Sequence, residues 1–226
     1  MITLNQKLNQ ALIIAAYGFE ELRNNCKLYL SKHDLNFDKF TVVSHDSFIG
    51  YISEYFLKEY IINTYNSKGI TVATWEDNYD IAKIRNILKS ESKEINNIDY
   101  IRSYFYDKYD LKISNGDSSI LVDIKTALTK LEPKLNWNFL YPVIQAHKPG
   151  KDHMVLAYYV VDEIKDIESL KKLVVIGYIS EETIKKCNII KAGTLTRFGT
   201  KSQIDNYETE LSTHYRNIDK MIALIS

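Results

Sequence analysis

The stretch YDLKISNGDSSILVDIKTA, residues 109–127, contains two apolar runs on either side of a polar turn. Apolar and polar residues alternate on both sides of NGDS, a pattern typical of a β-hairpin. Successive side chains of a strand point to opposite faces, so Asp123 and Lys125 share the face opposite to the apolar residues Ile120, Val122 and Ile124. The hairpin is therefore expected to contribute its apolar face to the core and to carry charges on the other.

Asp110 joins Asp123 and Lys125 on that face in either register that the turn allows. If NGDS forms a four-residue loop, Asp110 lies directly opposite Asp123; if Asn115-Gly116 forms a two-residue turn, Asp110 is diagonal to Asp123. Two carboxylates roughly 5 to 8 Å apart repel each other unless a cation lies between them, and Mg²⁺ suits one or two carboxylates plus water and phosphate oxygens. The hairpin is thus a candidate Mg²⁺ site. The alternative is a cross-strand ion pair on an exposed face.

The rest of the chain alternates helical and strand patterns. Periodicity predicts helices over 4–31, from Asp46 or Ser47 onward, over part of 81–99 and near 211–225, and core strands over 153–161 and 172–180. No repeat or interdomain linker interrupts this order. We therefore expect one α/β domain over residues 1–226, with a mixed β-sheet flanked by helices.

Composition limits the classes of protein. The chain is 45% hydrophobic and 26% charged, which is typical of a folded domain. No apolar run approaches the roughly 20 residues that cross a bilayer, so a soluble, cytoplasmic protein without membrane contact is expected. Cys26 and Cys187 lie far apart and show no metal-ligand spacing, which favours reduced thiols.

Positive charge is concentrated in two segments although the net charge is zero. Residues 125–151 hold five lysines against Glu132, a local charge of +4, and residues 184–202 hold four lysines and Arg197 with no acid, a charge of +5. Two basic segments in a neutral protein predict local contact with a polyanion. The alternative is a pair of ordinary solvated loops.

Segment 128–152 has the residue types that read DNA. Its prolines exclude one continuous helix, its amides can bind adenine edges, its tryptophan can stack on a base, and its lysines can hold phosphates. The predicted contacts are Asn136, Asn138, Gln145, Trp137, Lys130, Lys134, Lys148 and Lys151, with Arg197 and Lys201 in a second contact segment, 191–203. The alternative is that Trp137 belongs to the core and that the amides cap turns.

Three short sequences together resemble the PD-(D/E)xK nuclease superfamily, and most of all its type II restriction endonucleases. They are GYISEYF (50–56) in a helix, YDLKI (109–113) and ILVDIKTA (120–127). The resemblance covers roughly residues 48–182, and Tyr109 stands where the family has proline. It implies a restriction-endonuclease-like core in which Asp110, Asp123 and Ile124 bind Mg²⁺, Lys125 positions or activates the attacking water, and Glu54 supplies a supporting carboxylate.

The resemblance implies hydrolysis of double-stranded DNA at a short palindromic site, leaving 5′-phosphate and 3′-hydroxyl ends. Cutting both strands of such a site with one motif per chain requires a homodimer, for which the N-terminal helix (4–31) and the last helix are the predicted interface. A companion DNA methyltransferase is expected in the same system. Two alternatives stay open: a repair or junction-resolving nuclease of the same fold, and a non-catalytic DNA-binding protein on a nuclease scaffold.

Overall fold

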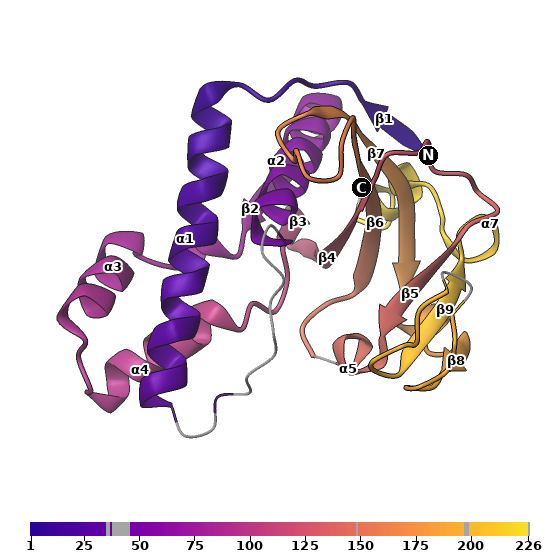
Figure 1. Ribbon diagram of the computed structural model, residues 1–226. Coiled ribbons are helices and arrows are strands. Elements are labelled where there is room, and N and C mark those ends of the chain that lie inside the picture. Colours follow the sequence, from indigo (N-terminus) through magenta and orange to yellow (C-terminus); the bar gives the residue numbers. More distant parts are fainter. Residues whose placement is uncertain (35–36, 38–45, 148, 197–198, 226) are drawn as a thin grey trace.

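A mixed six-stranded sheet forms the centre of the protein in a computed structural model that describes residues 1–34, 37, 46–147, 149–196 and 199–225 (Figure 1). The strand order is β1-β7-β6-β4-β3-β2. The strands are β1 (Ile2–Leu4), β7 (Leu170–Ser180), β6 (His153–Val161), β4 (Ser118–Thr129), β3 (Leu111–Asn115) and β2 (Thr71–Thr74). Only the β4–β6 pair is parallel within this described sheet, and the remaining neighbours are antiparallel.

Strand β6 lies between β4 and β7 in the sheet, and both of its faces are buried by the elements that pack on the two sides of the sheet. Its alternate residues belong to two separate cores: Val155 and Tyr159 to the first, Leu156 and Tyr158 to the second. This explains the uninterrupted apolar run HMVLAYYVV, which is typical of a central strand covered on both sides.

Helix α2 (Asp46–Tyr65) and the C-terminal α8 (Ile218–Ile222) contribute to the first core, together with Leu12 and Ala16 of α1 (Gln10–His33). A small sheet of order β5-β9-β8 contributes to the second core. Its strands are β5 (Asn138–Pro142), β9 (Asn206–Glu210) and β8 (Asn188–Ile190). The short helices α5 (Val143–Ala146), α6 (Glu181–Ile184) and α7 (Leu211–His214) adjoin these strands.

A third cluster of buried residues joins α1 to α3 (Ile81–Ser90) and α4 (Ile95–Phe105). Cys26, Tyr29 and Leu30 of α1 pack there against Ile84 and Ile101. Figure 1 shows these three helices grouped beside the sheet rather than over its centre. The short helices η1 (Asn66–Lys68) and η2 (Glu76–Asn78) flank β2, the strand at this edge of the sheet.

The predicted α/β class, with a mixed sheet flanked by helices, is confirmed. The hairpin also has one of the two expected registers: Ser114 pairs with Ser119, which aligns Asp110 with Asp123. The turn itself is tighter than the expected four-residue loop, since Asn115 already pairs with Ser118. Gly116 has a positive φ of 55°, which suits the tight turn.

The predicted boundaries at both ends of the chain need correction. The first helix begins at Gln10 instead of residue 4, because residues 2–4 pair with β7, and it continues through Gly18 without a break. The predicted helix at 211–225 is two short helices, because Arg216 between them exchanges two backbone hydrogen bonds of 2.8 Å with Tyr178 of β7.

That exchange depends on Gly177. A Cβ atom at this position would lie 2.1 Å from the carbonyl oxygen of Arg216, and the φ angle of 148° is one that side chains rarely adopt. Glycine therefore allows the C-terminal segment to approach β7 closely. Among the described residues, no helix combines the length and apolar character that a bilayer span requires.

Candidate functional site

The β3–β4 hairpin carries the proposed site on its polar face. Ile120, Val122 and Ile124 are buried in the first core, as their alternation predicts. Asp123 and Lys125 point to the other face, where the Lys125 Nζ donates to Asp123 Oδ1 at 3.0 Å. Asp110 comes directly before β3, and its carboxylate accepts a hydrogen bond from the backbone N–H of Ile124.

Asp123 lies in a cation-rich environment. Besides Lys125, the hydroxyl of Tyr141 donates to Asp123 Oδ2 at 2.9 Å, and the Lys151 Nζ lies 3.7 Å from the same oxygen. Lys151 also donates to the Tyr141 hydroxyl at 2.9 Å. The Asp123 side chain is 14% exposed and that of Lys151 only 3%, so this network is shielded from water.

The network holds Asp123 ionised. Burial alone would raise the pKa of Asp123, but Lys125, Lys151 and two side-chain hydrogen bonds outweigh it and lower the pKa below the ordinary value. Burial also disfavours the charged form of Lys125 and would lower its pKa. The charges of Asp123 and Asp110 outweigh burial and raise the pKa of Lys125 above the ordinary lysine value. Both groups therefore stay charged at neutral pH.

Asp110 has the opposite environment although it lies on the same face. Burial and then the negative charge of Asp123 raise its pKa well above the ordinary value, and Lys125 and the Ile124 hydrogen bond only partly offset them. The positive charge near Asp110 is thus too small to stabilise its ionised form fully.

Glu54 reaches this acidic side from α2. Burial raises its pKa well above the ordinary value, and the charges of Asp110, Glu76 and Asp107 raise it further. Arg23 of α1 is the opposing cation, with an Nη2 that lies 3.3 Å from Asp107 Oδ2. The structure therefore places the predicted Glu54 close enough to Asp110 for the two charges to interact, in an acidic group that also includes Glu76 of η2 and Asp107 after α4.

The donor set fits a hard divalent cation in part. Within the described ranges, no group of three or more His, Cys, Asp or Glu side chains lies close enough to hold a metal ion. Mg²⁺ needs fewer protein ligands, since one or two carboxylates with waters and phosphate oxygens complete its shell. Asp110 and Asp123, with the main chain of Ile124, match that smaller set, and a cation between the carboxylates would relieve the repulsion that raises the pKa of Asp110.

The predicted DNA-reading residues of segment 128–152 are spread over different environments. Trp137 is half-buried against the second core, with its ring centroid 5.6 Å from that of Tyr158. This agrees with the alternative that Trp137 belongs to the core. Asn138 is in β5 and donates to Glu208 Oε1 at 2.8 Å. Gln145 is half-buried in α5, whereas Asn136 is exposed.

The predicted phosphate contacts differ in the same way. Lys151 is buried in the Asp123 network instead of lying on the surface, and Lys130 pairs with Glu163 at 2.9 Å. Lys134 and Lys201 are exposed and form no ion pair within the part of the chain that the structure describes. Two further predicted contacts, Lys148 and Arg197, lie outside the described residues.

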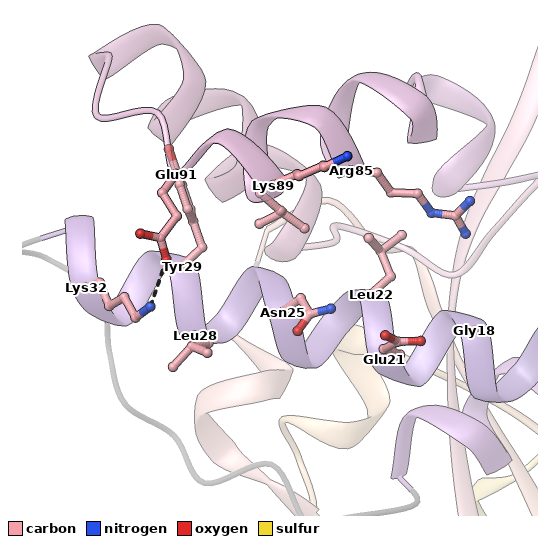
Figure 2. A pocket seen from close by; sticks show the side chains of 11 residues that line it. Gly18, Glu21, Leu22, Asn25, Leu28, Tyr29, Lys32, Arg85, Lys89 and Glu91 are labelled. Atoms are coloured by element: carbon pink, nitrogen blue, oxygen red, sulfur yellow. Dashed lines mark hydrogen bonds and ion pairs between the residues drawn. The ribbon is translucent and has the colours of Figure 1, made fainter.

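A groove of about 450 Å³ lies between α1 and α3, away from the hairpin (Figure 2). Leu22 and Leu28 give it apolar walls, and Arg85 and Lys89 extend over it from α3. None of the predicted catalytic residues lines this groove. The groove is also lined by charged residues, but its Lys32–Glu91 ion pair is exposed to solvent. We place the candidate site at the hairpin because its carboxylates and lysines are shielded from water.

The sequence did not indicate Tyr141 as a site residue. Tyr141 is fully buried in β5 and reaches Asp123 across the space between the two sheets. A strand pattern in NWNFLYP was legible between its flanking prolines, but no local pattern shows that a tyrosine hydroxyl bonds a carboxylate 18 residues away. The burial of Lys151 beside Asp123 was not predicted for the same reason: no local pattern shows a contact between residues 28 positions apart in the chain.

Comparisons of the chain with protein-family models, with curated proteins and with solved structures found no match.

Proposed function

We propose that this protein is a Mg²⁺-dependent endonuclease of double-stranded DNA with a restriction-endonuclease-like core. The observation that carries the proposal is the meeting of Asp110, Asp123 and Lys125 on one shielded face of a hairpin, with the charge of Glu54 on a separate helix interacting with that of Asp110. The sequence patterns that resemble type II restriction endonucleases fall on α2, β3 and β4, the elements that build this face.

Asp110, Asp123 and the main chain of Ile124 are the residues that would hold Mg²⁺. When bound, the ion polarises a phosphoryl oxygen and lowers the pKa of a coordinated water. Lys125 keeps its proton, because neighbouring carboxylates raise its pKa. It therefore acts as a fixed positive charge and donor to the anionic transition state, not as the proton acceptor.

The ionised form of Glu54 is a stronger proton acceptor than an ordinary glutamate carboxylate. Burial and the nearby charge of Asp110 raise its pKa well above the ordinary glutamate value, and a base works best when its pKa approaches the working pH. In the proposed reaction, Glu54 supports the site as the carboxylate that takes up a proton from the attacking water. The products carry 5′-phosphate and 3′-hydroxyl ends.

Cleavage at a short palindrome by a homodimer is part of the proposal, together with a cytoplasmic location and a companion methyltransferase. The last helix is an unsuitable dimer interface, because Ile218, Met221 and Ile222 are buried in the protein's own core. Helix α1 leaves Ile14 and Leu28 exposed, so we place the interface on α1.

A non-catalytic DNA-binding role is the second candidate, and one observation favours it. Asp123 already accepts hydrogen bonds from Lys125 and Tyr141 and lies near Lys151, as a purely structural ion-pair network would. Such a network stabilises a fold without needing a metal ion. A repair or junction-resolving nuclease differs from our first candidate only in its choice of DNA.

One cleavage experiment separates the three candidates. Purified protein is incubated with a plasmid library of diverse sequence and Mg²⁺, and all new ends are sequenced. Cuts at one short sequence are expected. Random nicks, or cuts confined to branched or damaged DNA, would instead identify a repair nuclease, and intact DNA under conditions in which the protein binds it would identify a non-catalytic protein.

DNA reading is tested with two exposed residues of segment 128–152. Asn136→Ala is expected to weaken binding of the cognate site by about 1 to 3 kcal/mol and to leave random DNA unaffected, since an amide can read an adenine edge. Lys134→Ala should weaken both alike and reduce the salt slope by about one. Titrations in Ca²⁺ at several salt concentrations measure this, and equal losses from Asn136→Ala on both DNAs would move base reading elsewhere.

A further inference from the structure

Lys151 is a buried cation without a role in the proposed reaction as described above. Its side chain is 3% exposed, and its Nζ lies 2.9 Å from the Tyr141 hydroxyl and 3.7 Å from Asp123 Oδ2. A buried ammonium is costly to desolvate unless a charge or dipole offsets the cost. The Tyr141 hydroxyl and the Asp123 carboxylate offset this cost, so Lys151 is stabilised next to a proposed metal ligand.

The backbone fixes Lys151 at this position. The next residue, Asp152, is tied to β4 by two hydrogen bonds: its N–H donates to the Leu121 carbonyl at 2.8 Å, and its carboxylate accepts from the Leu121 N–H at 2.7 Å. Leu121 is two residues before Asp123 on the same strand. The ammonium of Lys151 is thus held near Asp123 by the segment directly before β6, independently of the Lys125 side chain.

A fixed cation at this place has opposite effects on two steps of a metal-dependent reaction. It repels a second cation, so it weakens binding of a divalent metal ion to Asp123 in the free protein. It also attracts the extra negative charge that develops on a phosphodiester during displacement, so it favours the transition state. Neither effect requires Lys151 to touch the DNA.

We propose that Lys151 is a positioning residue of Asp123 whose fixed charge lowers the affinity of the free site for divalent metal and accelerates DNA cleavage once metal and DNA are bound. The inference rests on the proposed nuclease function. It adds a second lysine, from the segment directly before β6, to the lysine of the D-x-K strand. The Tyr141 hydroxyl bridges the two partners, because it donates to Asp123 while accepting from Lys151.

The test uses Lys151→Gln, which removes the charge but keeps a donor for Tyr141. Two quantities are measured: Mn²⁺ binding to the full-length protein without DNA, by electron paramagnetic resonance, and single-turnover DNA cleavage at saturating Mg²⁺. The dissociation constant for Mn²⁺ is expected to fall on the order of tenfold and the cleavage rate to fall at least as much. Lys151→Arg, which keeps the charge, should stay close to wild type in both.

Lys130→Met is the matched control, since Lys130 is an exposed lysine paired with Glu163 at 2.9 Å, and it should change neither quantity. Weaker metal binding together with slower cleavage in Lys151→Gln, or no change in either, would overturn the inference. If Lys151→Gln does not fold, Lys151→Met replaces it, and failure of both while Lys151→Arg folds would show a structural role instead. Failure of the nuclease proposal itself is recognised separately, because wild-type protein would then neither bind Mn²⁺ nor cut DNA.

Discussion

The two halves of the candidate site contain the same chemical group in opposite surroundings. On one side, Asp123 lies among Lys125, Lys151 and the Tyr141 hydroxyl, and its pKa is lowered. On the other side, Asp110 faces other carboxylates, and its pKa is raised. Both side chains are shielded on one sheet face, so burial alone does not separate them.

Because burial acts on both carboxylates in the same direction, the difference between their pKa values comes from the neighbouring charges. Burial is the largest single influence on both pKa values and acts in the same direction in each. The cation-rich half offsets it completely, whereas the acidic half has Arg23 opposite Glu54, Glu76 and Asp107. A divalent cation would supply the charge that the acidic half lacks.

The strongest test of this contrast replaces each hairpin carboxylate by its amide. Asp123→Asn and Asp110→Asn should both reduce DNA cleavage on the order of 10³-fold or more, as loss of an essential catalytic group does, with DNA binding in Ca²⁺ retained. Their stabilities should differ. Asp123→Asn takes the nearest counter-charge from Lys125 and Lys151 and should lose about 3 kcal/mol, whereas Asp110→Asn removes a repelled charge and should lose nothing.

Urea unfolding at pH 7 and a plasmid cleavage assay measure the two effects. The contrast has a defined pH dependence: the lowered pKa of Asp123 stabilises the fold above its ordinary value of 3.8, and this contribution is lost as the pH falls through the lowered pKa. Normal cleavage by either variant would return the hairpin to an ion-pair role. Equal losses of stability in both variants would contradict the inference that Asp123 has cation-rich and Asp110 acidic surroundings.

The next test removes the cation of the acidic half. Arg23→Met should lower the free energy of unfolding by about 2 kcal/mol at pH 7, because Asp107 loses its partner and Phe105 loses a guanidinium 4.8 Å from its ring. The loss should shrink toward pH 4, because the raised pKa values of Glu54 and Glu76 let these two neighbours take up protons there and need less opposing charge. Arg23→Lys, which keeps the charge, should lose less, and a pH-independent loss would show that packing alone is involved.

The smallest expected effect is at Glu54. Glu54→Gln removes a buried, repelled charge and should stabilise the fold at pH 7 on the order of 1 kcal/mol, a usual size for relief of functional-site strain. Because the pKa of Glu54 is raised, the folded protein holds an extra proton above pH 4.5, and wild type loses stability as the pH rises through that range.

The gain from Glu54→Gln should therefore be absent at pH 4 and grow toward neutral pH. Thermal melts over this range measure it, and Glu59→Gln on the same helix serves as the control outside the acidic group. A gain that is already present at pH 4 would mean that the amide improves packing or hydrogen bonding instead of relieving charge. The same variant should cut DNA more slowly if Glu54 accepts the proton.

Local pattern was enough for the hairpin. Alternation of apolar and polar residues fixed the inward face of β4 and grouped Asp110 with Asp123 and Lys125, because the two-residue period of a strand is set by backbone geometry alone. The run of β6 likewise showed a central strand. Periodicity failed at the chain ends, where pairing of residues 2–4 and Arg216 with β7 overrode helical spacing.

Only the tertiary structure decided which groups surround each carboxylate. Tyr141 reaches Asp123 because the small sheet packs against β6 and β7, next to β4, and Lys151 reaches it because Asp152 is hydrogen-bonded to Leu121 of β4. Arg23 reaches Asp107 because α1 packs against α4. The sequence by itself determined the class of fold and the residues that share one strand face, since both follow from local periodicity. Charge balance at the site depends instead on distances between segments far apart in the chain, and these are set by the packing of the two sheets and the helices.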